Sequence, residues 1–351
     1  MLNLAKMQAI AHDSHAVAAA KCFGPAGTRT LQALIEMITR LYRNIDPAQR
    51  KQPLLLFMRP PQVNPFAPPP ETAAPLHEVT DPDRVWHELN SACVVEVTDA
   101  GRLKVFEPGT FDAADLSAEA IVYIYKDGVE CFLINRVKYT IINPAPTHAS
   151  IFARPTFSSL AQSLEDYRTR VARNTSCFIL EDAWSDCKRL FLRAKPEKTM
   201  RRSLHQYLRT VFPDAEVRPE SVVDESHPVD IKITWSDTNR RALIEIKWLG
   251  QSRDENGRFT TAYTASRARE GAKQLADYLD GDRTAGPGLR TRGYLVVFDA
   301  RRRALTENIS SVGADDGLYY RDAEIDYQPA YHELREDFEL PVRMFAEPVL
   351  N

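Results

Sequence analysis

The chain has 351 residues, with 45 Lys and Arg against 48 Asp and Glu and a net charge of −3. This balance excludes a uniformly basic nucleic-acid-binding protein, so any such surface must come from local clusters. The length predicts two or three domains, and a hydrophobic content of 44% is enough to form their cores. No apolar run approaches the roughly 20 residues that a membrane span needs.

The first 20 residues are rich in alanine but are interrupted by Lys6, His12, Asp13 and His15, which makes them a poor signal peptide. Five cysteines are scattered along the chain without a C-x-x-C pair, which is typical of a reducing compartment and argues against an iron–sulfur cluster. We therefore expect a cytoplasmic protein.

Residues 1–52 are expected to form a helical segment. Between Thr30 and Ile45, apolar residues recur at helical spacing and form one stripe, which would pack on its own domain or on a partner. Nine prolines lie between Pro53 and Pro82, and they predict an extended connector over 53–82.

Residues 83–175 are expected to form a β-rich domain. Asp127-Gly128 lies between two β-prone runs, which is a strong hairpin signal, and a turn around Gly101 gives a weaker one. A helix is predicted from Ser158 to Val171. We find no catalytic residues in this region and assign it to substrate selection, dimerisation or partner docking.

Two apolar runs in the second half, Val229–Trp235 and Ala242–Trp248, are joined by a polar turn and predict paired strands. Residues two apart in a strand point the same way, so Glu245 and Lys247 share a face, and a hairpin can bring Asp230 beside them. Two carboxylates and an ammonium together can bind a hard cation next to a proton carrier. This set is suited to metal-assisted phosphodiester hydrolysis.

These residues resemble the PD-(D/E)XK nuclease superfamily, over roughly residues 186–305. Asp230 matches the first half of the signature and Glu245-Ile246-Lys247 the second, although Val229 separates Pro228 from the aspartate. The resemblance implies an α/β protein with a restriction-endonuclease-like αβββαβ core in its C-terminal half, in a nuclease domain over 176–351.

The predicted neighbouring elements follow the order of that core. Residues 274–278 resemble the Q-L-x-x-Y motif on a helix of RecB-like nucleases, with Gln274 and Tyr278 at its ends. The predicted elements are a strand at Arg189–Leu192, a helix at Lys195–Val211, a strand at Glu216–Val223, a helix at Ser266–Leu279 and a strand at Gly293–Asp299.

The resemblance also implies roles for the site residues. Asp230 and Glu245 would hold Mg²⁺ or Mn²⁺, with the carbonyl of Ile246 as a further ligand. Lys247 would orient or deprotonate the attacking water, or stabilise the pentavalent state. The alternative is that Asp230, Glu245 and Lys247 form a structural ion-pair cluster.

Two helical residues complete the predicted site. Glu197 would serve as an auxiliary acid that holds a second metal or a metal-bound water, and Gln274 would position the water or the phosphate. Glu197 has an alternative role at a helix start, where the helix dipole favours an acid. Gln274 and Tyr278 could instead edge a core-facing helix, and His205 is expected to be a surface or core histidine.

Basic residues cluster between Lys188 and Arg209 and between Arg290 and Arg303. Such clusters can hold phosphates, although exposed helix faces are usually charged. The residues predicted to contact nucleic acid are Lys198, Arg201, Arg202, Arg301 and Arg302.

Three functions compete. The first is a metal-dependent endo- or exodeoxyribonuclease, with a role as an effector of bacterial defence against phage expected from the habits of the family. The second is a catalytically silent scaffold in a multiprotein complex, and the third is a ribonuclease. Because cutting both strands of a duplex usually needs two sites, we expect a homodimer or larger assembly, with the N-terminal region available to a protein partner.

Overall fold

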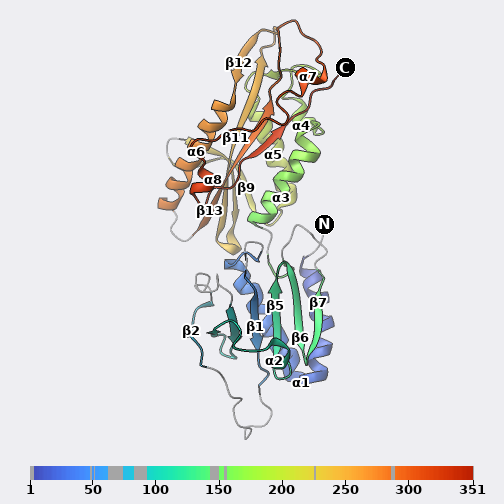
Figure 1. The fold of residues 1–351 in the computed structure, drawn as a ribbon, viewed down its shortest axis with the longest axis vertical. Helices are drawn as coiled ribbons and strands as arrows, with labels where there is room; N and C mark the ends of the chain where they lie inside the picture. The colour runs from blue at the N-terminus through green and yellow to red at the C-terminus, as the bar shows by residue number, and fades with distance from the viewer. Residues whose placement is uncertain are drawn as a thin grey trace. The chain divides into compact units, whose positions relative to one another are not determined.

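The computed structural model describes residues 4–47, 50, 52–61, 74–82, 93–142, 150–153, 156–224, 227–285 and 289–350. The chain divides into two compact units, Met1–Ser158 and Ser159–Asn351. Each unit contains a mixed β-sheet, and the first also contains a long N-terminal helix (Figure 1). The protein is therefore of the α/β class.

The first unit is a seven-stranded sheet in the order β2-β4-β3-β1-β5-β6-β7, with α1 packed on one face. Its elements are α1 (Leu4–Asn44), β1 (Leu54–Met58), β2 (His77–Val79), β3 (Cys93–Val97), β4 (Leu103–Phe106), α2 (Ala113–Leu116), β5 (Ile121–Lys126), β6 (Val129–Ile134) and β7 (Val137–Ile141).

The helix predicted at Thr30–Ile45 is confirmed as the second half of α1. Gly24 has a φ of 62° and precedes Pro25, so the backbone kinks there before the helix resumes. Leu31, Leu34 and Ile38 of the predicted stripe are fully buried in the core that α1 shares with the sheet, and Ile35 is partly buried against it. This apolar face therefore packs on its own unit.

The predicted connector over 53–82 is wrong for Leu54–Met58. These five apolar residues form the central strand β1, which pairs with β3 on one side and β5 on the other. Because the next proline is Pro60, the strand keeps the backbone donors that a central position needs. The connector prediction is also wrong for His77–Val79, which form strand β2 paired with β4. The part of the prediction that covers residues 62–73 lies outside the described residues.

The predicted hairpins are confirmed. The β5–β6 turn has positive φ at both Asp127 (50°) and Gly128 (77°), as a two-residue hairpin loop requires. The β3–β4 pair turns at Gly101, which has a φ of 71°. The segments over 1–52 and 83–175 were expected to be separate, but the described residues of both as far as Ser158 belong to one unit with one sheet.

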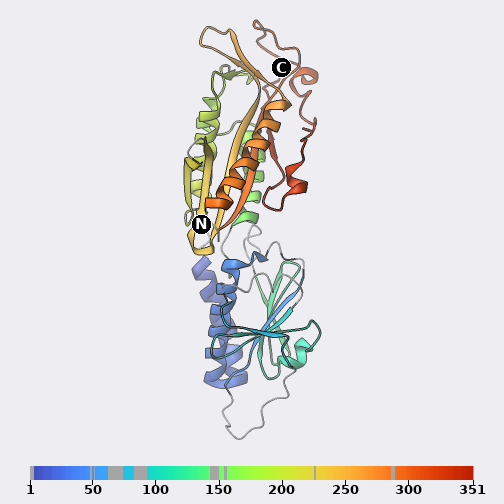
Figure 2. The ribbon, with the colours of Figure 1, turned by 90° about the vertical axis from the view of Figure 1, so that its left-hand side faces the viewer.

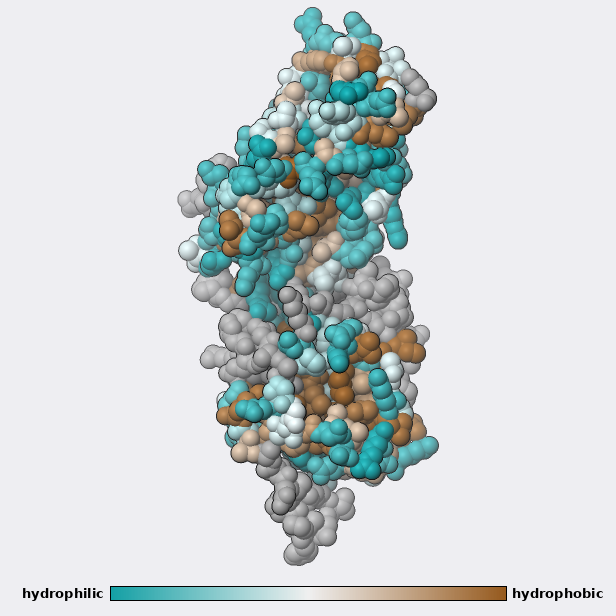
Figure 3. Space-filling view, in the orientation of Figure 1, coloured by the Kyte–Doolittle hydropathy of each residue, from teal (hydrophilic) through white to brown (hydrophobic). Residues whose placement is uncertain are grey.

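The sheet face opposite α1 is covered in part by α2 and its flanking loops. Phe57, Phe106 and Phe111 pack together there. Leu55 and Leu133 on the same face remain partly exposed, and apolar residues are visible over this face of the first unit in the space-filling view (Figure 3).

The second unit contains a sheet in the order β14-β13-β11-β10-β9, with helices on both faces (Figures 1 and 2). Its helices are α3 (Phe157–Tyr167), which continues into a π-helical turn (Arg168–Ala172), α4 (Phe178–Glu181), α5 (Glu197–Val211), α6 (Ala265–Ala285), α7 (Ala314–Gly317) and α8 (Tyr331–Leu334). Its strands are β8 (Leu192–Arg193), β9 (Glu216–Asp224), β10 (His227–Trp235), β11 (Arg240–Arg253), β12 (Phe259–Tyr263), β13 (Arg290–Ala300) and β14 (Val342–Phe345).

The two faces of this sheet carry different helices. Leu295 and Val297 of β13 pack with α6, whereas the ring of the next residue, Phe298, contacts Tyr167 of α3. Tyr167 also shares a hydrogen bond of 2.8 Å with Ser203 of α5, so α3 and α5 lie together. Because α3 packs in this unit, the boundary falls at residue 159 instead of the predicted 176.

The predicted elements of the second unit are present, in the order α5, β9, β10, β11, α6, β13, with the short strand β12 inserted after β11. The strand predicted at Arg189–Leu192 is reduced to Leu192–Arg193, because Arg189 adopts a φ of 58° that an extended strand does not allow. Among the described residues, no helix combines the length and apolar character needed to cross a membrane.

A buried carboxylate in the first unit provides a test of its core. Glu130 accepts hydrogen bonds from Tyr123, from the Ser150 hydroxyl (2.6 Å) and from the Ile151 amide (3.3 Å). Burial raises the pKa of the Glu130 carboxyl above its usual value.

Because the pKa of Glu130 is higher in the folded state than in the unfolded state, its contribution to the free energy of unfolding falls as pH rises through that interval. We predict that Glu130→Gln removes this fall, so the variant gains stability relative to wild type between pH 5 and 8, by at most about 1.4 kcal/mol per pH unit. Urea unfolding at both pH values measures it, with exposed Glu107→Gln as the control. Parallel pH profiles for wild type and Glu130→Gln would contradict the prediction.

Candidate active site

The β10–β11 hairpin brings the three predicted charges together. Ile231 pairs with Ile244 in the antiparallel ladder, so Asp230 and Glu245 are the next residues along the two strands. Asp230, Glu245 and Lys247 are 5%, 2% and 3% exposed. Charges as deeply buried as these need partners, because an isolated ion in an apolar interior is strongly unfavourable.

Each carboxylate has a defined set of partners. Lys247 donates to Oε1 of Glu245 in a buried ion pair. Oδ2 of Asp230 accepts from the backbone N–H of Ile246 at 2.8 Å, which places that peptide at the site, and Oδ1 accepts from Nη1 of Arg201 at 2.8 Å. Oε2 of Glu245 is buried and accepts no hydrogen bond from any described residue. This oxygen is left for a ligand.

Glu197, in the first turn of α5, belongs to the same electrostatic cluster. Burial and then the charge of Asp230 raise the pKa of its carboxyl, against the opposing charge of Lys247. For Glu245, burial is again the largest cause of a raised pKa, followed by the charge of Asp230, and Glu197 adds to it. The three carboxylates are thus close enough to repel one another, as they would when surrounding a cation.

The donor chemistry fits a hard divalent cation, because carboxylate oxygens are the ligands that Mg²⁺ and Mn²⁺ prefer. The unpartnered Oε2 of Glu245 and the mutual repulsion of the acids support this fit. As they stand, however, no three His, Cys, Asp or Glu side chains in the described part of the chain are gathered into a metal-binding group. Arg201 and Lys247 instead form ion pairs with the carboxylates of Asp230 and Glu245.

Gln274 and Tyr278 of α6 lie next to this cluster. Gln274 donates from Nε2 to the hydroxyl of Tyr278, which is directed at the carbonyl of Pro228 at 3.4 Å. Burial, and then the charge of Glu245, raise the pKa of Tyr278 to about 12. The hydroxyl that Gln274 contacts is therefore within electrostatic range of the carboxylates.

Two further residues of α6 were not predicted as part of the site. A Cβ added at Gly271 would lie 2.5 Å from Cγ and 3.0 Å from Cε of Lys247, so only glycine leaves room for that side chain. Arg267 opposes the raised pKa of Glu197. The signal for Gly271 was its position on the apolar stripe of the helix, and Arg267 lies one turn before it.

The predicted basic residues separate into two groups. Lys198 and Arg202 are exposed on α5, and Arg201 lies in the site. Arg301 instead pairs through two nitrogens with Asp299, and buried Arg302 donates to the carbonyls of Arg189 and Ala346. Arg301 and Arg302 therefore hold the chain together around β13 and are not presented to a phosphate.

His205, which was expected to be a surface or core histidine, links two elements of the second unit. His205 shares a hydrogen bond of 3.2 Å between Nε2 and the carbonyl of Val217, which ties α5 to β9.

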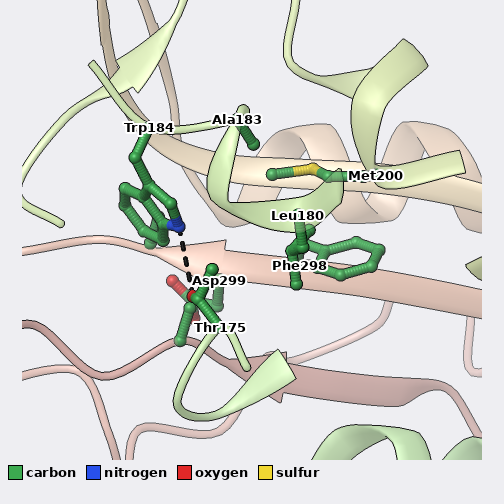
Figure 4. Close-up of a pocket in the computed structure, with 9 residues that line it drawn as sticks. Thr175, Leu180, Ala183, Trp184, Met200, Phe298 and Asp299 are labelled. Atoms are coloured by element: carbon green, nitrogen blue, oxygen red, sulfur yellow. Dashed lines mark hydrogen bonds between the residues drawn. The ribbon is translucent and has the colours of Figure 1, made fainter. Parts of the chain in front are cut away.

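A small cavity of about 10 Å³ lies away from this cluster, between β13, α4 and α5 (Figure 4). Leu180, Met200 and Phe298 give it apolar walls. Its volume is about that of a single water, so it is too small for a substrate. Asp299 at its edge is already paired with Arg301 and Arg343.

Comparisons with protein-family models, with curated proteins and with solved structures gave no match to this chain. The interpretation of the site therefore depends on its own geometry and chemistry.

The close contact at Gly271 gives a test with a matched control on the same helix. Gly271→Ala should displace Lys247 from Glu245 and lower the free energy of unfolding, because the new methyl group would lie 2.5 Å from Cγ, close to the backbone of Lys247, as well as 3.0 Å from Cε. Gly281→Ala, whose Cβ would meet nothing within 4 Å, should raise it by up to about 1 kcal/mol through helix propensity. Urea unfolding of both variants measures the difference; equal stabilisation by both would show that α6 does not constrain Lys247.

Proposed function

We propose that this protein is a metal-dependent phosphodiesterase that hydrolyses DNA, with a PD-(D/E)XK nuclease core in its second unit. The observation that carries the proposal is the burial of Asp230, Glu245 and Lys247 side by side, with one carboxylate oxygen of Glu245 left without a hydrogen bond. Most buried polar atoms in folded proteins have a hydrogen-bond partner, so an unpaired carboxylate oxygen beside two further acids supports a cation-binding role.

The arrangement of elements around the hairpin supports the same proposal. The order helix, three strands, helix, strand is that of the αβββαβ core, with β12 as an insertion. β13 pairs in parallel with β11, which is the strand that carries Glu245 and Lys247. The two helices that contribute Glu197 and Gln274 are the first and second helices of this order.

In this proposal Asp230, Glu245, Glu197 and the backbone of Ile246 hold Mg²⁺ or Mn²⁺. When bound, the metal would neutralise phosphate charge and lower the pKa of a water. Lys247 adds a second positive charge beside the reacting phosphate and can orient the attacking water through its ammonium protons. Gln274, in contact with Tyr278, positions the water or the phosphate.

The exposed residues of α5 supply the contacts to the nucleic-acid backbone. Lys198 and Arg202 are four residues apart on this helix and so project from one face of it. Phosphate contacts of this kind bind any sequence and weaken with salt. DNA as substrate and a role in defence against phage belong to the proposal as expectations from the family resemblance. A cytoplasmic location is expected from the scattered cysteines, and a homodimer or larger assembly from the need for two sites to cut both strands of a duplex.

A cleavage assay tests the proposal. Wild-type protein should cut DNA with Mg²⁺ or Mn²⁺ and not with EDTA, and Asp230→Ala, Glu245→Ala and Lys247→Ala should each lower the rate by ~10²-fold or more. Plasmid, linear and single-stranded DNA, together with RNA, separate the substrate classes. Gly281→Ala serves as the control that retains the rate. Undiminished cleavage by the Asp230 or Glu245 variant would contradict the assignment of these residues to the active site. An absence of cleavage on every substrate would favour the alternative of a catalytically silent scaffold.

The binding surface on α5 is tested separately from the chemistry. In Ca²⁺, the double change Lys198→Gln and Arg202→Gln should weaken DNA binding and flatten its salt dependence by about 0.7–0.9 in log–log slope for each lost phosphate contact. Fluorescence anisotropy across a salt series measures it. Arg303→Gln is the control, because Arg303 is paired with Asp316 at 2.6 Å. An unchanged slope in the double variant would leave Lys198 and Arg202 as a solvated helix face.

A further inference from the structure

Arg201 lies inside the charge cluster instead of on the exposed face of α5. Its guanidinium pairs with Oδ1 of Asp230 at 2.8 Å, and its side chain is only 16% exposed. It follows Glu197 by four residues, which places both side chains on the same face of α5. The structure thus holds a basic side chain against a carboxylate that a metal would need.

Both oxygens of Asp230 are already taken by protein donors. Oδ2 accepts from the backbone of Ile246, which is fixed by the strand, whereas Oδ1 accepts from a long and movable side chain. A divalent cation that binds Oδ1 would lie beside this guanidinium, so Asp230 binds the cation more strongly once Arg201 withdraws. Guanidinium and metal also repel each other at this distance, so the two compete for one oxygen.

We propose that Arg201 couples metal binding to nucleic-acid binding. In the free protein Arg201 occupies Asp230. When a phosphodiester enters the site, its oxygens take the guanidinium, and Asp230 is released to the metal. The inference rests on the proposed function, because it assigns the phosphate of the substrate as the group that moves Arg201.

The chemistry of arginine suits this exchange. A guanidinium binds a phosphate through two parallel hydrogen bonds, so leaving a carboxylate for a phosphate costs it little. Coupling between two ligands is reciprocal, so nucleic acid should tighten metal binding by the same factor as metal tightens nucleic-acid binding. The usual range of such factors is about 5- to 150-fold.

Calorimetric titration with Ca²⁺, with and without a 30-base-pair duplex, tests the coupling while Ca²⁺ leaves the DNA uncut. Wild-type protein should bind Ca²⁺ at least about 5-fold more tightly when the duplex is present. Arg201→Gln should bind Ca²⁺ about 5-fold more tightly than wild type without DNA and show no further gain when DNA is added. Arg209→Gln removes an exposed arginine of the same helix and should behave as wild type in both titrations.

Two results would overturn the inference: Ca²⁺ affinity in Arg201→Gln that equals or falls below that of wild type without DNA, or coupling that persists in this variant. If Arg201→Gln does not fold, Arg201→Lys carries the test. A lysine keeps the charge beside Asp230 but lacks the paired donors, so its coupling should be smaller than in wild type, and equal coupling would overturn the inference. If Arg201→Gln binds Ca²⁺ more tightly but wild-type protein cleaves no DNA, the nuclease function is wrong and the competition for Asp230 still holds. If wild-type protein cleaves DNA but Arg201→Gln has the Ca²⁺ affinity of wild type, only the coupling is wrong.

Discussion

The ion pair between Lys247 and Glu245, buried in the ladder of β10 and β11, is the constraint around which the second unit is built. Two opposite charges on one strand face would be unfavourable in an apolar sheet unless each found its partner, and here they are nearly excluded from solvent. The neighbouring elements adapt to this pair. Gly271 is the residue of α6 that lies against Lys247, and Arg201 of α5 pairs with the adjacent Asp230.

The cluster stabilises the fold poorly for the number of charges that it buries. Burial and mutual repulsion raise the pKa values of Glu197 and Glu245, which means that their ionised forms cost free energy in the folded protein. A buried ion pair replaced by apolar residues is often neutral or stabilising. A site that retains three acids under these conditions is better explained by a bound cation than by stability, and this argument supports the proposed metal-dependent chemistry.

The distribution of arginine shows why charge clusters in a sequence do not by themselves define a binding surface. Arg301 and Arg302 follow β13 in a strongly basic run, yet one is held by buried Asp299 and the other by backbone carbonyls. Lys198 and Arg202 belong to a similar run but project from an exposed helix face. The difference depends on which acids and carbonyls the fold places opposite each side chain.

The sequence by itself determined the hairpin, the flanking helices and the three charges at its centre, because short β-branched runs, helical spacing and two-residue alternation are local properties of the chain. It also showed that a hairpin can bring Asp230 beside Glu245, and the strand register in the structure places them opposite each other. It did not determine that Leu54–Met58 forms a central strand, because the partners of that strand lie tens of residues away along the chain. Only the tertiary structure decided that Arg201 pairs with Asp230 and that Gly271 makes room for Lys247, because both contacts join segments whose distance in space depends on how the helices pack against the sheet.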